Sequence, residues 1–391
     1  MIDVEVWHAN DIDAAKWFAN ACNRAVPGTY QFNFATIPAA GSAAFLRLSE
    51  TFQRLLRLDK PDLVATYTQG GLATPIVSLE ITATTPHGQH GKQRFARLAA
   101  AAELQIPAIY IIPFEKLAEV KGRPQIYPLG GDVPYGLQRL TKVTDCPATC
   151  FPFPSSGGEL LKDSKHPGQP DSNSPEMGDC FRLVAEYLAV AKHRRQISAS
   201  KCPKIVERAI ESTAALAKEP IISHYKTLEL IKTVDLEKYL ASKLDLSTSW
   251  IRKSIAGFPP RFATRPETLI FKPDGRMFEK AGDPYCGMFS WIDYSFCRTG
   301  RNPQQRFRNL IYMPMKGGRC RSMADNFARD GYSKFWQQGS SLRLPRPEKV
   351  EQQFGISHEL RYGGIFLMIK PLRIYGYLAD LIVFRDAVLP F

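Results

Sequence analysis

The chain has 391 residues, 44% of them hydrophobic and 23% charged, a composition that excludes a fibrous, collagen-like or wholly disordered protein. Its formal net charge of +13 at pH 7 favours an anionic partner, nucleic acid first and a membrane surface second. The surplus is uneven: residues 1–150 hold 14 basic and 13 acidic side chains, whereas residues 298–391 hold 16 and 7. We therefore expect the C-terminal quarter to contact a polyanion.

The cysteines and the N-terminus indicate a cytoplasmic protein. Eight cysteines are scattered along the chain and form no CxxC pair, which favours reduced thiols and argues against a structural zinc site. The first residues include acids and no apolar leader, and apolar runs such as 364–369 are far shorter than the roughly 20 residues of a membrane helix. No membrane partner is expected.

Composition divides the chain into four regions. Residues 1–145 read as an α/β domain, and residues 146–180, rich in Pro, Gly and Ser, read as a linker or long surface loop. Residues 181–249 have apolar side chains at helical spacing and predict a helical segment. Residues 250–391 mix aromatics, Gly and Pro with short β-like runs, which predicts a basic α+β domain.

The first region contains a recognisable order of elements. Alternating or β-branched runs predict strands, and apolar residues on one helical face predict helices. In chain order we expect a strand at 30–37, a helix at 43–58, strands at 63–67 and 76–82, a helix at 92–105 and a strand at 107–112. A helix between two strands is the βαβ unit of an open mixed sheet.

Two carboxylates stand on the neighbouring strands of this region. Asp62 begins the strand at 63–67, and Glu80 lies inside the strand at 76–82. Adjacent strands are about 4.8 Å apart, so two such side chains on one face can share a metal ion, and Mg²⁺ needs only one or two protein carboxylates. The alternatives are that Asp62 is a turn residue with local hydrogen bonds and that Glu80 is a charge on an edge strand.

With Pro61-Asp62, Glu80-Ile81-Thr82, and a preceding helix that carries Glu50, residues 30–115 resemble the PD-(D/E)xK nuclease superfamily, the fold of many restriction endonucleases. The resemblance implies an α/β restriction-endonuclease-like core with a mixed sheet, and Mg²⁺-dependent hydrolysis of phosphodiesters. It implies that Asp62, Glu80 and the carbonyl of Ile81 bind the metal, with Glu50 as an accessory acid. The metal would lower the pKa of a water molecule and stabilise charge on phosphorus.

The chain departs from that pattern at one position. Thr82 stands where Lys is the commonest residue of the superfamily, so a different side chain must supply the cation. Lys92 and Arg94, at the start of the next helix, are the candidates. A nuclease fold without activity is the alternative.

The loop before that helix predicts a contact to the nucleic-acid backbone. The free N–H groups of a helix N-terminus bind phosphate, and here they follow a loop that contains His87 and Gln89 and precede Gln93 and Arg94. His87 and His90 offer a transition-metal site as one alternative, and a solvated turn is the other.

The C-terminal region predicts recognition of double-stranded DNA. Arginine side chains read guanine edges and bind phosphates, and four of them follow closely on one another: Arg298, Arg301, Arg306 and Arg308. We therefore predict a site-specific, restriction-type DNA endonuclease, which would be a homodimer if it cuts a palindrome. The alternatives are an inactive nuclease-fold protein that binds nucleic acid and a basic scaffold that binds acidic protein or lipid.

Overall fold

The structure is a computed structural model, and it describes residues 2–39, 42–58, 60–83, 86, 94–193, 197–198, 200–214, 216–217, 227–243, 248–249, 251–252, 260–272, 308–312, 380–384 and 387–390. The chain is a mixed α/β protein that divides into two compact units, Met1–Pro220 and Ile221–Phe391.

The first unit is built on a six-stranded mixed sheet with the order β2-β1-β3-β4-β5-β8. Only β3 is antiparallel to its neighbours, so the start of β3 lies at the same edge as the carboxyl ends of the other strands. The strands are β1 (Ile2–His8), β2 (Tyr30–Thr36), β3 (Leu63–Gln69), β4 (Leu72–Ile81), β5 (Ala108–Pro113) and β8 (Ala148–Phe153).

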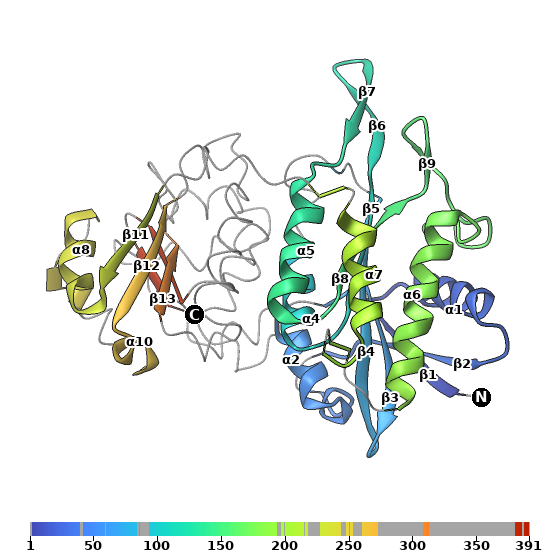
Figure 1. Ribbon diagram of the computed structural model, residues 1–391, viewed down its shortest axis with the longest axis horizontal. Coiled ribbons are helices and arrows are strands. Elements are labelled where there is room, and N and C mark those ends of the chain that lie inside the picture. Colours follow the sequence, from blue (N-terminus) through green and yellow to red (C-terminus); the bar gives the residue numbers. More distant parts are fainter. Residues whose placement is uncertain are drawn as a thin grey trace. The chain divides into compact units, whose positions relative to one another are not determined.

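Helices cover both faces of this sheet. One face packs against α1 (Ile12–Ala25) and α6 (Pro175–Lys192), and the other contacts α2 (Glu50–Leu58) and α4 (Phe95–Glu103). The edge strand β8 contacts α5 (Asp132–Thr144) and α7 (Pro203–Ala214). Figure 1 shows α5, α7 and α6 side by side across the sheet.

The main core fixes which way the strand side chains point. Trp17 and Phe18 of α1 each pack edge-on against Phe181 of α6 in this core. The strand residues in the same core alternate along each strand: Leu63, Ala65, Val77, Leu79, Ile109 and Ile111. Because successive side chains of a strand point to opposite faces, the intervening residues face α2 and α4.

The β3–β4 hairpin carries two features that set its register. Its turn is formed by Gly70 and Gly71, both at positive φ, as a tight two-residue hairpin turn requires. Beyond the turn, Thr66 pairs with Pro75 but Ala65 pairs with Val77, which leaves Ile76 as one extra residue on β4. Because of this bulge, the β3 residues from Ala65 back to Leu63 each pair with a β4 residue one position later than the turn alone would give.

The strands predicted at 30–37, 63–67, 76–82 and 107–112 are present as β2, β3, β4 and β5. The helix predicted at 43–58 is interrupted. A 3₁₀ turn, η1 (Phe45–Arg47), precedes α2, and the Ser49 N–H donates to the Ala73 carbonyl oxygen at 2.9 Å. The Ser49 hydroxyl accepts from the N–H of Phe52, so Ser49 caps α2 and the helix begins anew.

The stretch 146–180, expected to be a linker, differs from that expectation. Its first part is β8, a buried strand of the main sheet, followed by β9 (Ser155–Ser156) and β10 (Glu159–Leu160). The turn after them is closed by Asp163, whose carboxylate accepts the N–H groups of Lys165 and His166 and the hydroxyl of Ser172. Nearby, β6 (Glu115–Val120) and β7 (Arg123–Pro128) form a projecting hairpin (Figure 1).

The second unit contains a five-stranded sheet with the order β11-β12-β13-β14-β15. The central three strands are parallel and the two outer ones antiparallel to them. Its elements are β11 (Thr227–Lys232), η3 (Thr233–Asp235), α8 (Leu236–Lys243), α10 (Pro260–Thr264), β12 (Glu267–Lys272), β13 (Arg308–Tyr312), β14 (Leu381–Phe384) and β15 (Ala387–Pro390). The predicted helical segment 181–249 is thus divided between the units, since α6 and α7 belong to the first and α8 to the second.

The structure bears on two predictions from the sequence, reduced cysteines and the lack of a membrane-spanning helix. The described cysteines, which are Cys22, Cys146, Cys150, Cys180 and Cys202, are all free thiols. None of the described helices combines the length and the apolar character that a membrane crossing needs.

Candidate functional site

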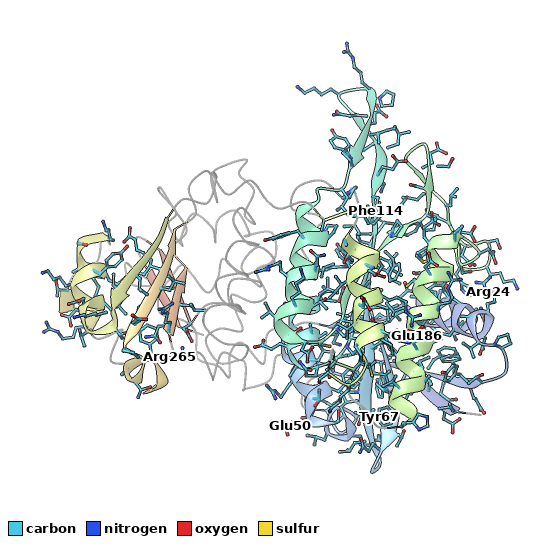
Figure 2. All side chains as sticks on the ribbon, viewed as in Figure 1. Arg24, Glu50, Tyr67, Phe114, Glu186 and Arg265 are labelled. Atoms are coloured by element: carbon cyan, nitrogen blue, oxygen red, sulfur yellow. The ribbon has the colours of Figure 1, made fainter. Side chains whose placement is uncertain are left out.

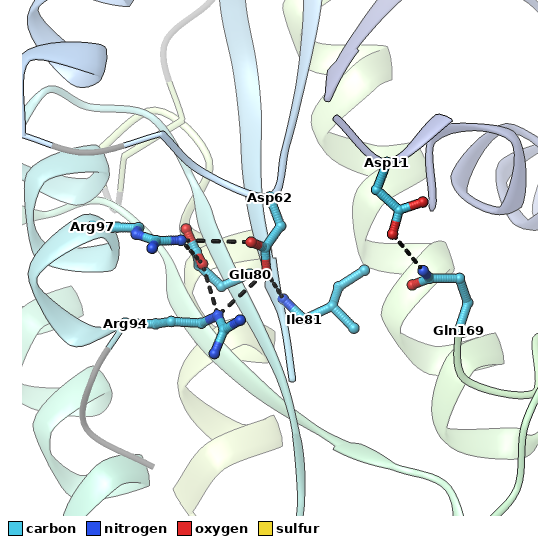
Figure 3. Close-up of polar contacts among 7 residues, drawn as sticks. All are labelled: Asp11, Asp62, Glu80, Ile81, Arg94, Arg97 and Gln169. Atoms are coloured by element: carbon cyan, nitrogen blue, oxygen red, sulfur yellow. Dashed lines mark hydrogen bonds and ion pairs between the residues drawn. The ribbon is translucent and has the colours of Figure 1, made fainter. Parts of the chain in front are cut away.

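Asp62 and Glu80 lie together on the face of the sheet that α2 and α4 cover. Leu63 pairs with Leu79, and continuing this register by one residue puts Glu80 opposite Asp62. The N–H of Ile81 donates to Asp62 Oδ2 at 2.8 Å, so the side chain of Asp62 is held against the end of β4. The two carboxylates therefore converge at one edge of the sheet, as the sequence predicts (Figure 3).

Neither alternative for these residues describes what they do. Asp62 is bonded to a residue 19 positions away, not to its own turn. Glu80 is no edge-strand charge, because β4 lies between β3 and β5 and the Glu80 side chain is 0% exposed. A buried carboxylate in an apolar strand is costly unless other groups compensate it, which directs attention to its partners.

Two arginines from the start of α4 contact both carboxylates (Figure 3). Arg97 Nη1 lies 2.8 Å from Glu80 Oε2 and 3.5 Å from Asp62 Oδ1. Arg94 Nε lies 3.2 Å from the same Glu80 oxygen and 3.3 Å from Asp62 Oδ2. Each guanidinium thus bridges the two acids.

The cluster is partly open to solvent, and its members differ in exposure. The side chain of Asp62 is 28% exposed, those of Arg94 and Arg97 are 23% and 16% exposed, and that of Glu80 is fully buried. Glu80 Oε1 is buried and has no hydrogen-bond partner among the described residues, although Glu80 Oε2 has two guanidinium neighbours. Glu80 Oε1 is therefore a buried acceptor that the described hydrogen bonds of the cluster do not use.

Burial dominates the proton affinity of Glu80. Desolvation raises the pKa of Glu80 to about 8, because the ionised form has lost its water; Arg97 and Arg94 oppose this rise, and the negative charge of Asp62 adds to it. Tyr110 on β5, the register partner of Glu80, is also fully buried, and burial raises its pKa as well. The floor of the cluster is thus a low-dielectric environment in which charges interact strongly.

A third acid at the same edge of the sheet belongs to a different contact. Asp11 follows β1 and caps α1, where its Oδ1 accepts from the N–H of Ala14 at 2.9 Å. Its Oδ2 accepts from Gln169 Nε2 at 3.1 Å (Figure 3). Both oxygens of Asp11 serve the helix and the loop, and within the described ranges no group of three or more His, Cys, Asp and Glu side chains could hold a metal ion.

The other predicted residues of the site have mixed outcomes. Thr82 is buried, and its N–H donates to the carbonyl oxygen of Ile111 at 3.0 Å, continuing the pairing of β4 with β5. Glu50 is exposed on the first turn of α2 (Figure 2), whereas Asp62 and Glu80 make their described contacts with Ile81, Arg94 and Arg97. Its accessory role stays a prediction.

Several predicted contact residues lie outside the described residues: Lys92, His87, Gln89, His90, Gln93, Arg298, Arg301 and Arg306. Arg308 is described, and it begins β13 with its Nε donating to Glu267 Oε2 at 2.6 Å. That guanidinium pairs with a neighbouring strand, and its contact to DNA stays a prediction.

Arg97 is the residue of the cluster that the sequence analysis missed. Its signal was present, because residues three apart on a helix share a face, and Arg97 follows Arg94 by three. The buried face of the helix, with Phe95, Leu98 and Ala99, is next to this pair and orients it towards the sheet. Comparison with protein-family models, with curated proteins and with solved structures gave no match to the chain.

Proposed function

We propose that the chain is a Mg²⁺-dependent DNA endonuclease of the restriction type, with Asp62 and Glu80 as its metal-binding carboxylates. The observation that carries this proposal is their convergence from two adjacent strands onto one partly open site. The order α2, β3, β4, α4, β5 around them supports the PD-(D/E)xK resemblance, which rests on a helix before the two acidic strands and a helix and a strand after them.

The donor set fits Mg²⁺. This ion takes oxygen ligands and commonly uses one or two carboxylates, completing its shell with water and substrate phosphate. Asp62 is accessible to solvent, and Glu80 Oε1 is a buried acceptor without a hydrogen-bond partner among the described residues. The main chain of Ile81 adjoins Asp62, so its carbonyl is the candidate for a further oxygen ligand.

The chain's own side chains have separate roles in this proposal. Mg²⁺, when bound, would polarise the scissile phosphodiester and a water molecule and so promote hydrolysis. Ile81 orients Asp62 through its N–H, and the buried floor beside Tyr110 strengthens the field of Glu80. Arg94 and Arg97 supply the positive charge that Thr82 lacks, because a guanidinium binds phosphate oxygens in a bidentate manner.

Double-stranded DNA is the proposed substrate because of the charge distribution. The formal charge is +13, and residues 298–391 hold 16 basic and 7 acidic side chains. Binding through phosphates should weaken steeply as salt is added. A homodimer is proposed for cleavage of a palindrome, since a two-fold axis matches two active sites to two strands.

One observation favours an inactive relative as the second candidate. Both acids are already in contact with guanidiniums, as in a purely structural ion cluster, and Thr82 replaces the usual lysine. Such a protein would bind DNA without cutting it.

Plasmid nicking tests the proposal. The full chain with Mg²⁺ should nick supercoiled DNA, EDTA should abolish nicking, and Asp62→Asn and Glu80→Gln should each lose at least about a thousandfold in rate, which corresponds to about 4 kcal/mol of transition-state stabilisation. Asp179→Asn is the control, because Asp179 is an exposed acid of α6 paired with Arg182. Equal nicking by all the variants would rule out this site, and DNA binding without nicking would favour the inactive candidate.

A further inference from the structure

Arg94 and Arg97 occupy the space between the two carboxylates where a shared cation belongs. Three of the four carboxylate oxygens lie within 3.5 Å of a guanidinium nitrogen, and only Glu80 Oε1 does not take part. A metal ion that enters to bridge Asp62 and Glu80 meets two positive charges at the same oxygens. Like charges this close repel strongly in a site whose side chains are at most 28% exposed.

The arginines can leave only if their charge finds another anion. A guanidinium that abandons a buried carboxylate without replacement leaves both groups uncompensated, which is costly. A phosphodiester offers the replacement, because it presents oxygens in the geometry that guanidinium binds best. Arg94 and Arg97 stand at the start of α4 and are 23% and 16% exposed, so a phosphate in solvent can reach both guanidiniums.

We propose that Arg94 and Arg97 close the site to metal until nucleic acid arrives, and that they exchange the two carboxylates for the substrate phosphate when it binds. This inference rests on the proposed function and adds to it the order in which nucleic acid and metal bind. Metal and nucleic acid then bind cooperatively, and by linkage each raises the affinity of the other by the same factor. The two arginines are positioning residues in the resting site and phosphate contacts in the assembled one.

Mn²⁺ is a suitable probe, since it shares the oxygen preference of Mg²⁺ and its free ion is counted by electron paramagnetic resonance. Mn²⁺ is titrated into the full chain alone and into the chain with a short DNA duplex. The same titrations of Asp62→Asn give the background from the duplex and from other sites. We expect the wild-type chain to bind Mn²⁺ about tenfold or more tightly with the duplex than without it, a typical size for such coupling.

The arginine variants isolate the cause. Arg94→Gln together with Arg97→Gln should bind Mn²⁺ without DNA about tenfold or more tightly than the wild type, and the duplex should add little. Arg182→Gln removes a surface guanidinium of α6 that pairs with Asp179, and it should behave as the wild type. If the double variant does not fold, as judged by its circular dichroism, Arg94→Gln alone keeps the 2.8 Å contact of Arg97 with Glu80 and should show the same change to a smaller degree.

The outcomes separate this inference from the function on which it rests. Wild-type protein that binds Mn²⁺ equally well with and without DNA, and as tightly as the arginine variants, overturns the exchange but leaves the metal site standing. Arginine variants that bind no Mn²⁺ above the Asp62→Asn background overturn the metal site itself, and the exchange with it.

Discussion

Two buried arginine–carboxylate clusters, one in each unit, differ in how completely their groups are satisfied. In the second unit Arg265 Nη1 lies 3.0 Å from Asp380 Oδ2, and the two side chains are only 6% and 5% exposed. The same Asp380 oxygen accepts the N–H of Leu310 at 2.9 Å, and Arg265 also reaches Asn309 Oδ1. Among the described residues, this pair is sealed from water and surrounded by hydrogen bonds.

The cluster of the first unit has the opposite character. Two guanidiniums share two carboxylates, the Asp62 end is 28% exposed, and Glu80 Oε1 is buried without a hydrogen-bond partner in the described part of the chain. A closed pair such as Arg265 and Asp380 fixes strands in place, whereas an open and incompletely satisfied group of charges can exchange partners. The contrast between sealed and open pairs is what distinguishes a structural ion pair from a candidate site.

Removing one partner of the sealed pair should have the largest effect on stability. Asp380→Ala removes the carboxylate that the buried Arg265 guanidinium contacts at 3.0 Å and also the acceptor of the Leu310 N–H, so we expect a loss of about 3–5 kcal/mol in the free energy of unfolding. Hydrogen–deuterium exchange read by mass spectrometry should show reduced protection in β12 and β13. Unchanged protection in these strands would show that the Arg265–Asp380 pair contributes little to stability. The contrast between a structural pair and an open cluster would then be wrong.

The second-largest expected effect is the pH dependence that Glu80 gives to the free energy of unfolding. With the pKa of Glu80 raised from 4.5 to about 8, the folded state keeps a proton that the unfolded state has released. The contribution of the protonated Glu80 to the free energy of unfolding is fully present below pH 4.5. It is lost as the pH rises towards 8, at roughly 1.4 kcal/mol per pH unit. Glu80→Gln carries no such proton, so between pH 5 and 7 the wild type should lose about 2–3 kcal/mol relative to it.

Paired urea denaturations at each pH measure this difference, because other titrating groups are common to both proteins and cancel. A constant difference across the range would mean that Arg94 and Arg97 keep Glu80 ionised throughout, and the open cluster would then be as well compensated as the sealed one.

Asp62 should show the smallest effect on stability. Asp62→Asn keeps an oxygen that can accept the Ile81 N–H, and a partly exposed ion pair is screened by water, so we expect a change within about 1 kcal/mol. Urea denaturation at pH 7 measures it, with Arg182→Gln as the exposed-pair control. If Asp62→Asn lowered the free energy of unfolding by more than about 3 kcal/mol, Asp62 would be a structural acid like Asp380.

The sequence predicted the strands of the first unit well where side-chain patterns are local. The alternation at 30–37 and the β-branched runs after Asp62 and around Glu80 reflect the packing of β2, β3 and β4. The helix at 43–58 was drawn too long, because Ser49 serves both as a cap and as a backbone partner of β4. Such a non-local hydrogen bond leaves no trace in periodicity.

The strand β8 was read as part of a linker because prolines surround it. Pro152 lies within β8 and cannot donate a hydrogen bond, which argues against a central strand. The strand is nevertheless accommodated because β8 is the last one in the sheet order and has a strand on one side only. Composition alone could not distinguish a proline-containing edge strand from a loop.

The candidate site was predicted in its acids but not in its basic partners. The carboxylates were found because charge within an apolar strand is unusual, and they do converge. Arg94 was named as a substitute cation for the lysine, yet its bridging of both acids with Arg97 depends on how α4 docks on the sheet. Docking angle is a tertiary property that one helical repeat does not encode.

The single extra residue on β4 has a consequence for how this site could arise or be lost. If Ile76 took a paired position in the ladder, the register set by the Gly70-Gly71 turn would continue, and Leu79 would stand opposite Asp62. Glu80 would then point into the apolar layer beneath α1 and α6. The bulge therefore decides which face of the sheet carries the second acid, and a slip of one residue that drew Ile76 into the ladder would separate the two carboxylates without changing either of them.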